Sequence, residues 1–138
     1  MKISAIAFIT VLLISLQALA GPPDPCAGFP DTDSDGFTDP CDNCILVANP
    51  SQADCDSDFC GNICDADFNQ DGVTGIADFS SLALVYGKPG CVQDIGAPDP
   101  PQPDGVIGIA DFSRFATLYG KSPGPSGTTP GTTACPKP

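Results

Sequence analysis

Oxygen-bearing side chains recur at alternate positions in one twelve-residue stretch of the chain, residues 67–78. They stand at positions one, three, five and twelve, with a glycine at position six: Asp67, Asn69, Asp71, Asp78 and Gly72. Such alternate oxygens converge on one calcium ion, because the glycine lets the chain turn sharply and the carbonyl of position seven, here Val73, adds a ligand. The spacing therefore predicts a calcium site.

A simpler interpretation of this stretch is a solvated Asp-Gly turn, in which Asp78 serves only as a charge or cap at the start of a helix. Electrostatics favour the metal site. Two carboxylates about 4 Å apart repel by roughly 4 kcal/mol at an effective dielectric constant of about 20. A converging set of carboxylates therefore needs a cation, and we expect calcium in this loop.

The same pattern returns 33 residues later, as part of an internal repeat. Positions five, six, seven and twelve recur as Asp104, Gly105, Val106 and Asp111. Pro100 now stands at position one and has no side-chain oxygen, although Asp99 beside it could turn in; Gln102 stands at position three. We expect weaker calcium binding by Asp104, the Val106 carbonyl and Asp111. The alternative is a vestigial loop that persists only through helix packing.

Each loop leads into a predicted helix with a single apolar stripe. The stripe falls at i, i+3, i+4 and i+7 in both copies: Phe79, Leu82, Ala83 and Tyr86, then Phe112, Phe115, Ala116 and Tyr119. Gly87 and Gly120 stand where the glycine that ends a helix belongs. A helix of roughly ten residues cannot bury its stripe alone. We therefore expect two antiparallel loop–helix units in a pseudo-twofold pair.

A duplicated Asp-x-Asn-x-Asp-Gly loop that ends in Asp-Phe and leads into a short helix, without the first helix of an EF-hand, resembles the dockerin domain. Residues 66–121 carry the resemblance. It implies two loop–helix (F-hand) calcium motifs related by pseudo-symmetry, with the ligands already named. It also implies non-catalytic docking to a cohesin partner, usually to attach secreted polysaccharide-degrading enzymes to a scaffold.

Dockerins commonly present a polar pair to the cohesin at loop positions ten and eleven. Here the residues at those positions, the partner-binding candidates, are all apolar: Ile76, Ala77, Ile109 and Ala110. A hydrogen-bonded version of the cohesin interface is therefore absent. These four residues could still make a hydrophobic contact with a partner, or a contact within the chain itself.

Residues 31–65 are similar to thrombospondin type 3 calcium repeats, which alternate Asp-x-Asp-x-Asp-Gly with Cys-Asp-Asn-Cys and a later Asn-Pro-x-Gln. The runs Cys41-Asp42-Asn43-Cys44 and Asn49-Pro50-Ser51-Gln52 match closely. The resemblance implies calcium ligands in two motifs: Asp31, Asp33, Asp35 and Asp39, then Asp54, Asp56 and Asp58. In the second motif Phe59 replaces the glycine and Asn62 replaces an aspartate. The implied fold is irregular chain wound on calcium and pinned by disulfides.

The eight cysteines indicate a disulfide framework in an oxidising compartment. The thrombospondin resemblance implies the pair Cys44–Cys64. Proximity suggests Cys26–Cys41 and Cys55–Cys60, and elimination then leaves Cys91–Cys135. Zinc at Cys41 and Cys44 is the alternative, disfavoured by export and by the many aspartates nearby.

The composition excludes several classes of function. The chain of 138 residues has no histidine, and its acidic residues are all aspartate, so His-based triads, His-ligated zinc and haem are excluded in their usual forms. The formal net charge of −12 argues against nucleic acid and anionic membranes as partners. Too few apolar residues remain to enclose a catalytic cleft. We therefore expect a protein that is not an enzyme.

Residues 1–20 have the pattern of a cleaved signal peptide, with Lys2 before an apolar run and Ala18-Leu19-Ala20 at its end. An uncleaved anchor is the alternative. We expect a thrombospondin type 3-like segment at residues 21–65, a dockerin-like domain at 66–121, and a flexible tail rich in Pro, Gly, Ser and Thr at 122–138. The predicted fold class is a small protein of α-helices and irregular chain. We expect the protein to be secreted and to have no association with a membrane once the leader is removed.

The leading hypothesis is a secreted calcium-binding protein with a docking module, linked to extracellular polysaccharide degradation through attachment to a cohesin-like partner. The second is a structural or adhesive spacer that calcium rigidifies and that has no cohesin partner. The third is the C-terminal piece of a larger secreted hydrolase. All three depend on Ca²⁺, which in this composition must replace a large apolar core.

Overall fold

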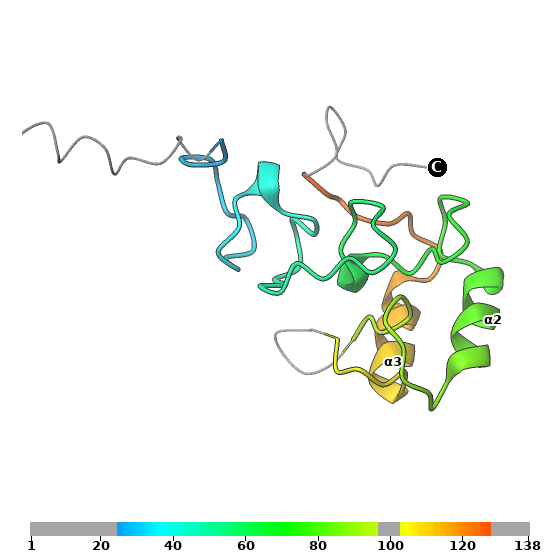
Figure 1. Ribbon diagram of the computed structural model, residues 1–138. Coiled ribbons are helices and arrows are strands. Elements are labelled where there is room, and N and C mark those ends of the chain that lie inside the picture. Colours follow the sequence, from blue (N-terminus) through cyan, green and yellow to red (C-terminus); the bar gives the residue numbers. More distant parts are fainter. Residues whose placement is uncertain (1–24, 97–102, 128–138) are drawn as a thin grey trace, which may run out of the picture.

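The computed structural model describes residues 25–96 and 103–127. Most of this chain is irregular, as predicted, and the described residues contain no strand (Figure 1). The elements are two single-turn 3-10 helices and two α-helices: η2 (Asp39–Cys41), η3 (Asn62–Cys64), α2 (Ile76–Val85) and α3 (Ile109–Leu118). The predicted leader 1–20, the tail from 128 onward, Cys135, Asp99, Pro100 and Gln102 lie outside the described residues.

The start of each helix is set by the aspartate at its third position. In α2 the backbone of Gly75 is extended, and its amide donates to Asp78 Oδ2 at 2.7 Å. Gly108 and Asp111 repeat this bond at 2.7 Å ahead of α3. An acidic side chain that reaches back to the first amide stabilises a helix N-terminus.

Both helices end at the glycines predicted from the sequence. Gly87 and Gly120 have left-handed backbones, with φ of 76° and 79°. Glycine adopts this conformation without strain, which makes it the usual residue just after a helix.

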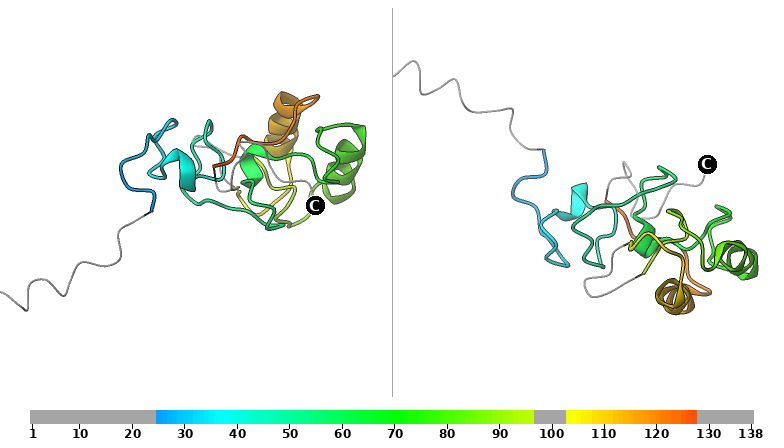
Figure 2. Two further views of the ribbon diagram at one scale, coloured as in Figure 1. Left: turned by 90° about the horizontal axis from the view of Figure 1, so that it is seen from above. Right: turned by 60° about the horizontal axis from the view of Figure 1, so that its bottom comes forward.

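The two helices lie side by side (Figure 2), and the loop ahead of each helix is hydrogen-bonded to the chain that follows the other. The amide of Thr74 donates to the Lys121 carbonyl and its carbonyl accepts from Gly120, both at 2.8 Å. Ile107 makes the equivalent bonds with Gly87 and Lys88, at 2.8 and 3.0 Å. Each loop is therefore held by the chain that follows the opposite helix.

The core between the helices differs from the predicted one. The fully buried residues are Ala66, Leu82, Ile95, Ile107 and Phe115. Of the two predicted stripes only Leu82 and Phe115 are fully buried, whereas Tyr86 and Tyr119 are about half exposed. The reason is that Asp78 and Asp111 point inward toward their loops, which rotates both stripes partly toward solvent.

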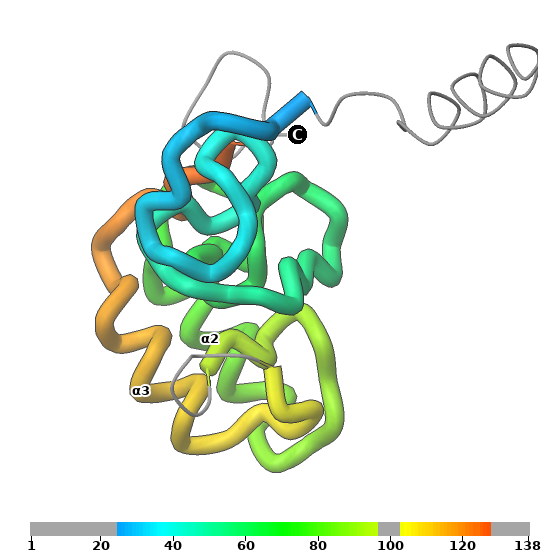
Figure 3. The backbone as a smooth tube through the Cα atoms, turned by 90° about the vertical axis from the view of Figure 1, so that its left-hand side faces the viewer, coloured from blue at the N-terminus to red at the C-terminus, as the bar shows by residue number. Residues whose placement is uncertain are grey.

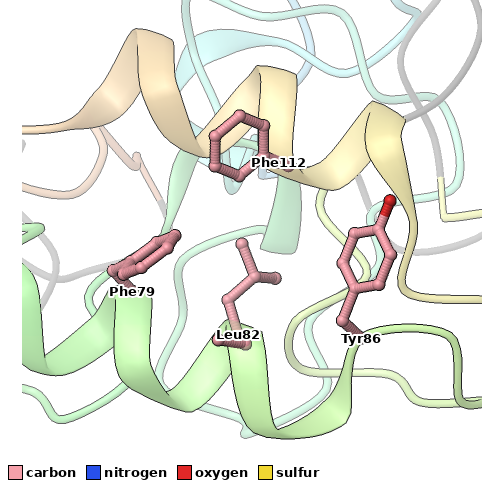
Figure 4. A pocket seen from close by; sticks show the side chains of 5 residues that line it. Phe79, Leu82, Tyr86 and Phe112 are labelled. Carbon is pink, nitrogen blue, oxygen red and sulfur yellow. The ribbon is translucent and has the colours of Figure 1, made fainter.

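This rotation leaves an apolar groove on the surface between the helices, of about 290 Å³. Its lining is Phe79, Leu82, Ala83, Tyr86 and Phe112 (Figure 4). The rings of Phe79 and Phe112 meet edge to face across it, with centroids 6.2 Å apart. The predicted partner-binding residues Ile76 and Ile109 are each 69% exposed.

The beginning of the irregular N-terminal segment lies away from the helices (Figure 3), whereas its end contacts α3, where Arg114 donates to the Ile63 carbonyl at 2.8 Å. The predicted disulfides Cys26–Cys41 and Cys44–Cys64 are confirmed. Around the second one lies a small apolar cluster of Cys44, Ile63 and Cys64, with Val47 against it. No free cysteine is found among the described residues, which excludes the predicted alternative of zinc at Cys41 and Cys44.

The other two disulfide predictions are wrong. Cys55 is bonded to Cys91, so it does not pair with Cys60, and Cys91 does not pair with Cys135. Cys60 is itself disulfide-bonded. The error has a physical cause: proximity along the sequence favoured Cys55 and Cys60, whereas the fold brings Cys91 to Cys55 from 36 residues away.

The beginning of the predicted flexible tail is bound to the N-terminal segment. The carbonyl of Pro125 accepts from Ile45 at 3.1 Å, and the amide of Gly127 donates to the Asp42 carbonyl at 2.8 Å. The Ser126 hydroxyl donates to the Phe59 carbonyl at 2.6 Å. Residues 124–127 of the predicted tail are therefore attached to the N-terminal segment by hydrogen bonds.

Candidate metal sites

Four aspartate loops share one pattern of hydrogen bonds. We number them along the chain as loop 1 (residues 31–42), loop 2 (54–65), loop 3 (67–78) and loop 4 (94–111). In each loop the carboxylate of position one accepts backbone amides that follow it, and the carboxylate of position five accepts the amide of position seven. The common pattern means that the four loops turn in the same way at positions five to seven.

Loop 3 links its predicted residues through backbone amides, but among the described residues its carboxylates do not form a tight group of the kind found in loops 1 and 2. Asp67 accepts from the amides of Asp71 at 3.0 Å and Gly72 at 2.5 Å. Asp78, at the other end of the loop, accepts from the Asn69 amide at 3.0 Å. Asp67 and Asp78 are almost completely buried.

The interior of loop 3 also receives a main-chain oxygen. A Cβ atom at Gly75 would lie 3.6 Å from the Val73 carbonyl oxygen and 3.8 Å from Asp78 Oδ2. Both oxygens therefore border the space that Gly75 leaves open.

Loop 4 begins at Asp94, a residue that the sequence analysis did not identify. Asp94 accepts from the amides of Asp104 at 3.0 Å and Gly105 at 2.5 Å. These are the bonds that Asp67 makes in loop 3. Asp111 accepts from the Gly96 amide at 2.9 Å, as Asp78 does from position three of its loop. Asp94 thus replaces Pro100, the expected position one.

Loop 4 is interrupted for a physical reason. Position four of loops 1, 2 and 3 has a left-handed backbone, at Ser34, Ser57 and Gln70. Pro103 stands at position four of loop 4 and cannot adopt a positive φ. Residues 94–96 therefore supply positions one to three, and the six residues 97–102 are an insertion ahead of Pro103. Position three is Gly96, which provides no side-chain ligand.

The sequence does contain a pattern that identifies Asp94 as the first residue of loop 4. Asp67 is followed by the apolar Phe68, and Asp94 is followed by the apolar Ile95. Both apolar residues pack in or against the core between the helices. Aligning the loops by this acid–apolar pair, with a gap, would have found Asp94.

Loop 1 holds one of the two tight carboxylate groups in the described residues. Each of Asp31, Asp33 and Asp35 offers an oxygen within 4.8 Å of the others. Asp31 accepts from the Ser34 amide at 2.7 Å and the Gly36 amide at 3.1 Å. Both oxygens of Asp33 are buried without a hydrogen-bond partner. Two such oxygens amid other carboxylates are the strongest indication of a cation site within residues 25–96 and 103–127.

The acid that completes loop 1 is Asp42, at position twelve. Asp42 is fully buried, with Oδ1 accepting from the Cys44 amide at 2.8 Å. Burial raises the pKa of Asp33 to about 6, and the negative charges of Asp42, Asp35 and Asp31 add to the increase. The predicted ligand Asp39 lies outside the group, because its two oxygens accept from the amide and hydroxyl of Thr32.

Loop 2 holds the second tight group, formed by Asp54, Asp56 and Asp58. Asp54 accepts from the Ser57 amide at 2.8 Å and the Phe59 amide at 3.0 Å. Asp58 Oδ2 is buried without a hydrogen-bond partner. Phe59 takes the place of the usual glycine with a left-handed backbone, at φ of 74°.

The last acid of loop 2 is Asp65, also at position twelve and also missed from the sequence. Burial raises the pKa of Asp65 to about 8, and the charges of Asp58, Asp56 and Asp67 contribute further. Asp65 and Asp42 could have been found by counting twelve positions from the first aspartate of each loop. The buried last acid is common to all four loops: Asp42, Asp65, Asp78 and Asp111.

Few cations of the protein can offset this charge. The described residues contain fifteen aspartates but only three basic side chains, Lys88, Arg114 and Lys121. Lys88 donates to the Leu84 carbonyl at 2.7 Å, and Arg114 donates to the Ile63 carbonyl at 2.8 Å. Burial lowers the pKa of Arg114. The buried carboxylates therefore depend on protons or on bound metal for neutralisation.

Comparison of the chain with family models, with curated proteins and with solved structures finds no match. Neither helix of the described segments has the length and apolar character that crossing a bilayer requires. The three described disulfides are consistent with an extracellular protein.

Proposed function

We propose that the protein is a secreted, non-catalytic calcium-binding protein. Loops 1 and 2 form a thrombospondin type 3-like segment, and loops 3 and 4 with their helices form a dockerin-like module of two related loop–helix units. The observation that carries the proposal is Asp33, whose two buried oxygens have no partner in a group of three carboxylates. A cation there satisfies both oxygens and removes the repulsion.

The donor set favours calcium over other metals. The candidate ligands are carboxylate, amide and main-chain carbonyl oxygens, which are the ligands of calcium. Zinc and copper prefer nitrogen and sulfur, but the chain has no histidine and its described cysteines are not free. Extracellular calcium at millimolar concentration is sufficient even for weak oxygen sites.

The residues that would hold each ion follow from the loops. Loop 1 offers Asp31, Asp33, Asp35 and Asp42, and loop 2 offers Asp54, Asp56, Asp58 and Asp65. Loop 3 offers Asp67, Asn69, Asp71, Asp78 and the Val73 carbonyl, and loop 4 offers Asp94, Asp104, Asp111 and the Val106 carbonyl. Loop 4 has the fewest side-chain ligands, so it binds calcium more weakly than loop 3.

A calcium titration of the oxidised protein by calorimetry tests the sites. Asp33→Asn removes the carboxylate without a partner and is expected to lower the number of bound ions by one. The matched control is Asp39→Asn, which removes a charge from the same loop but from a side chain already satisfied by Thr32. Equal stoichiometry for the two variants would refute the assignment of loop 1.

The groove between α2 and α3 supports the docking role. It is apolar and open to solvent, and Ile76 and Ile109, the first residues of the same two helices, are exposed. A cohesin-like partner would bind here through hydrophobic contact. A pull-down with a panel of cohesins, with and without a calcium chelator, tests this role.

A calcium-rigidified spacer is the second candidate, favoured by the way the two halves are joined. The disulfide Cys55–Cys91 and the bonds of residues 124–127 connect the N-terminal segment to the helical part. If no cohesin binds while calcium still orders the chain, the spacer role is supported and the docking role is refuted. The third alternative, a piece of a larger secreted hydrolase, is tested by whether relatives of this chain carry a large domain ahead of residue 24.

A further inference from the structure

Asn62 links loop 2 to the beginning of loop 4. It stands at position nine of loop 2, where loop 1 has Asp39, and its side chain is 5% exposed. Its Oδ1 accepts from the Cys55 amide at 2.9 Å, within its own loop. Its Nδ2 donates to the Cys91 carbonyl at 2.6 Å and lies 3.4 Å from the Asp94 carbonyl.

These bonds fix the residue around which loop 4 is built. The Cys91 carbonyl also accepts from the Asp94 amide at 3.0 Å, so the turn at 91–94 is held from both sides. Asp94 in turn binds the amides of Asp104 and Gly105. A displacement of Asn62 therefore moves the first acid of loop 4.

The position requires an amide. An aspartate at position 62 would keep the bond from Cys55 but would place a carboxylate oxygen against the carbonyls of Cys91 and Asp94. This explains why loop 2 has asparagine where loop 1 has aspartate. The Asn62 side chain therefore contacts the start of loop 4 and is not one of the proposed metal ligands.

We infer that Asn62 couples calcium binding at loop 2 to calcium binding at loop 4. The inference rests on the proposed function, since both loops must bind calcium. An ion in loop 2 orders the segment that carries Asn62, and an ordered Asn62 holds Asp94 in place for an ion in loop 4. By linkage the effect is reciprocal: calcium in loop 4 raises the affinity of loop 2 by the same factor.

Amide NMR of the oxidised full-length chain during a calcium titration measures each loop separately. The reporters are the position-six amides of Gly105 in loop 4 and Gly36 in loop 1. Asp58→Asn disables loop 2 and is expected to weaken calcium binding at Gly105 by about fivefold or more, a typical coupling between sites. When Asn62 is already replaced by aspartate, adding Asp58→Asn is expected to weaken calcium binding at Gly105 by less than twofold.

Asp33→Asn is the matched control, because it disables loop 1, which has no hydrogen bond to residues 91–96 in the described part of the chain. It is expected to leave the affinity reported by Gly105 unchanged. Asn62→Ala removes the donor without adding charge and should reproduce the result of Asn62→Asp. An equal loss of affinity in all backgrounds would overturn the inference, since the coupling would then run through the Cys55–Cys91 disulfide.

The reverse experiment needs no change at Asn62 and applies if the Asn62 variants do not fold. Asp104→Asn disables loop 4, and the Cys60 amide, which donates to Asp58 at 2.8 Å, reports loop 2. The affinity of loop 2 must then fall by the same factor; an unchanged affinity overturns the coupling. If no loop responds to calcium at all, the proposed function itself is refuted.

Discussion

Replacing Asp94 with asparagine tests whether loop 4 is closed by this residue. Asp94 is 1% exposed and accepts two backbone amides, at 3.0 and 2.5 Å. Asparagine keeps one acceptor oxygen but turns an NH₂ group toward the other amide, so one hydrogen bond to a charged group becomes a clash between donors. Such a bond contributes roughly 1.5–3 kcal/mol to stability.

The corresponding thermal effect is large enough to measure. A loss of 1 kcal/mol lowers the melting temperature of a domain of this size by roughly 4–8 °C, so we expect Asp94→Asn to lower it by about 10 °C in saturating calcium. The loss of a carboxylate ligand should also weaken calcium binding at the Gly105 amide by about tenfold or more, which corresponds to about 1.4 kcal/mol.

Asp99→Asn is the matched control for Asp94→Asn. Both variants remove one negative charge, but Asp99 is the residue that the sequence placed next to position one. We expect Asp99→Asn to leave the melting temperature and the calcium affinity of loop 4 close to those of the wild type. If Asp99→Asn is as harmful as Asp94→Asn, or if Asp94→Asn is harmless, the assignment of loop 4 is wrong.

Three further predictions concern the disulfides, the buried carboxylates and the packing. Peptide mapping without reduction is expected to recover a Cys55–Cys91 link, and a Cys55–Cys60 link would contradict the fold. Replacing both Cys55 and Cys91 with serine should lower the free energy of unfolding by roughly 3–4 kcal/mol, because the disulfide closes a long loop of chain. Burial raises the pKa of Asp65 to about 8 in the metal-free protein. The folded state then keeps a proton that the unfolded state loses near its ordinary value, so metal-free wild type should lose stability relative to Asp65→Asn as the pH rises from about 4 to about 8. Denaturant unfolding in EDTA at several pH values measures this, and a constant difference between the two proteins would refute it. Gly61→Ala would place a Cβ 2.7 Å from Cys44 Sγ, so we expect thermal unfolding to show a loss of roughly 1–3 kcal/mol; a wild-type melting temperature would contradict the packing.

Local patterns in the sequence predicted the local structure correctly. The two helices, their terminal glycines and the loop that runs from Asp67 to Asp78 follow from spacing within about twenty residues. The disulfides Cys26–Cys41 and Cys44–Cys64 were also found, one by proximity and one by resemblance. These features depend on backbone geometry and side-chain type over short separations.

Long-range features could not be predicted in the same way. Asp94 is separated from the rest of its loop by an insertion, and Cys91 lies beside Cys55 because the chain that follows α2 packs against loop 2. The rotation of the helices was missed because the hydrophobic pattern placed Phe79 and Tyr86 inward. The inward direction of Asp78 outweighs that pattern, since its carboxylate accepts the partly buried amides of Asn69 and Gly75.

The amide NMR spectrum of the oxidised, full-length protein in calcium and after exhaustive removal of calcium with EDTA tests the central claim most directly. Metal bound by the aspartate loops is proposed to organise this chain. We predict dispersed resonances for the amides of Gly36, Gly72 and Gly105 in calcium, and movement of these loop amides toward random-coil positions in EDTA while the disulfide-linked cluster around Cys44 and Cys64 stays folded. Identical spectra in the two conditions would contradict the account.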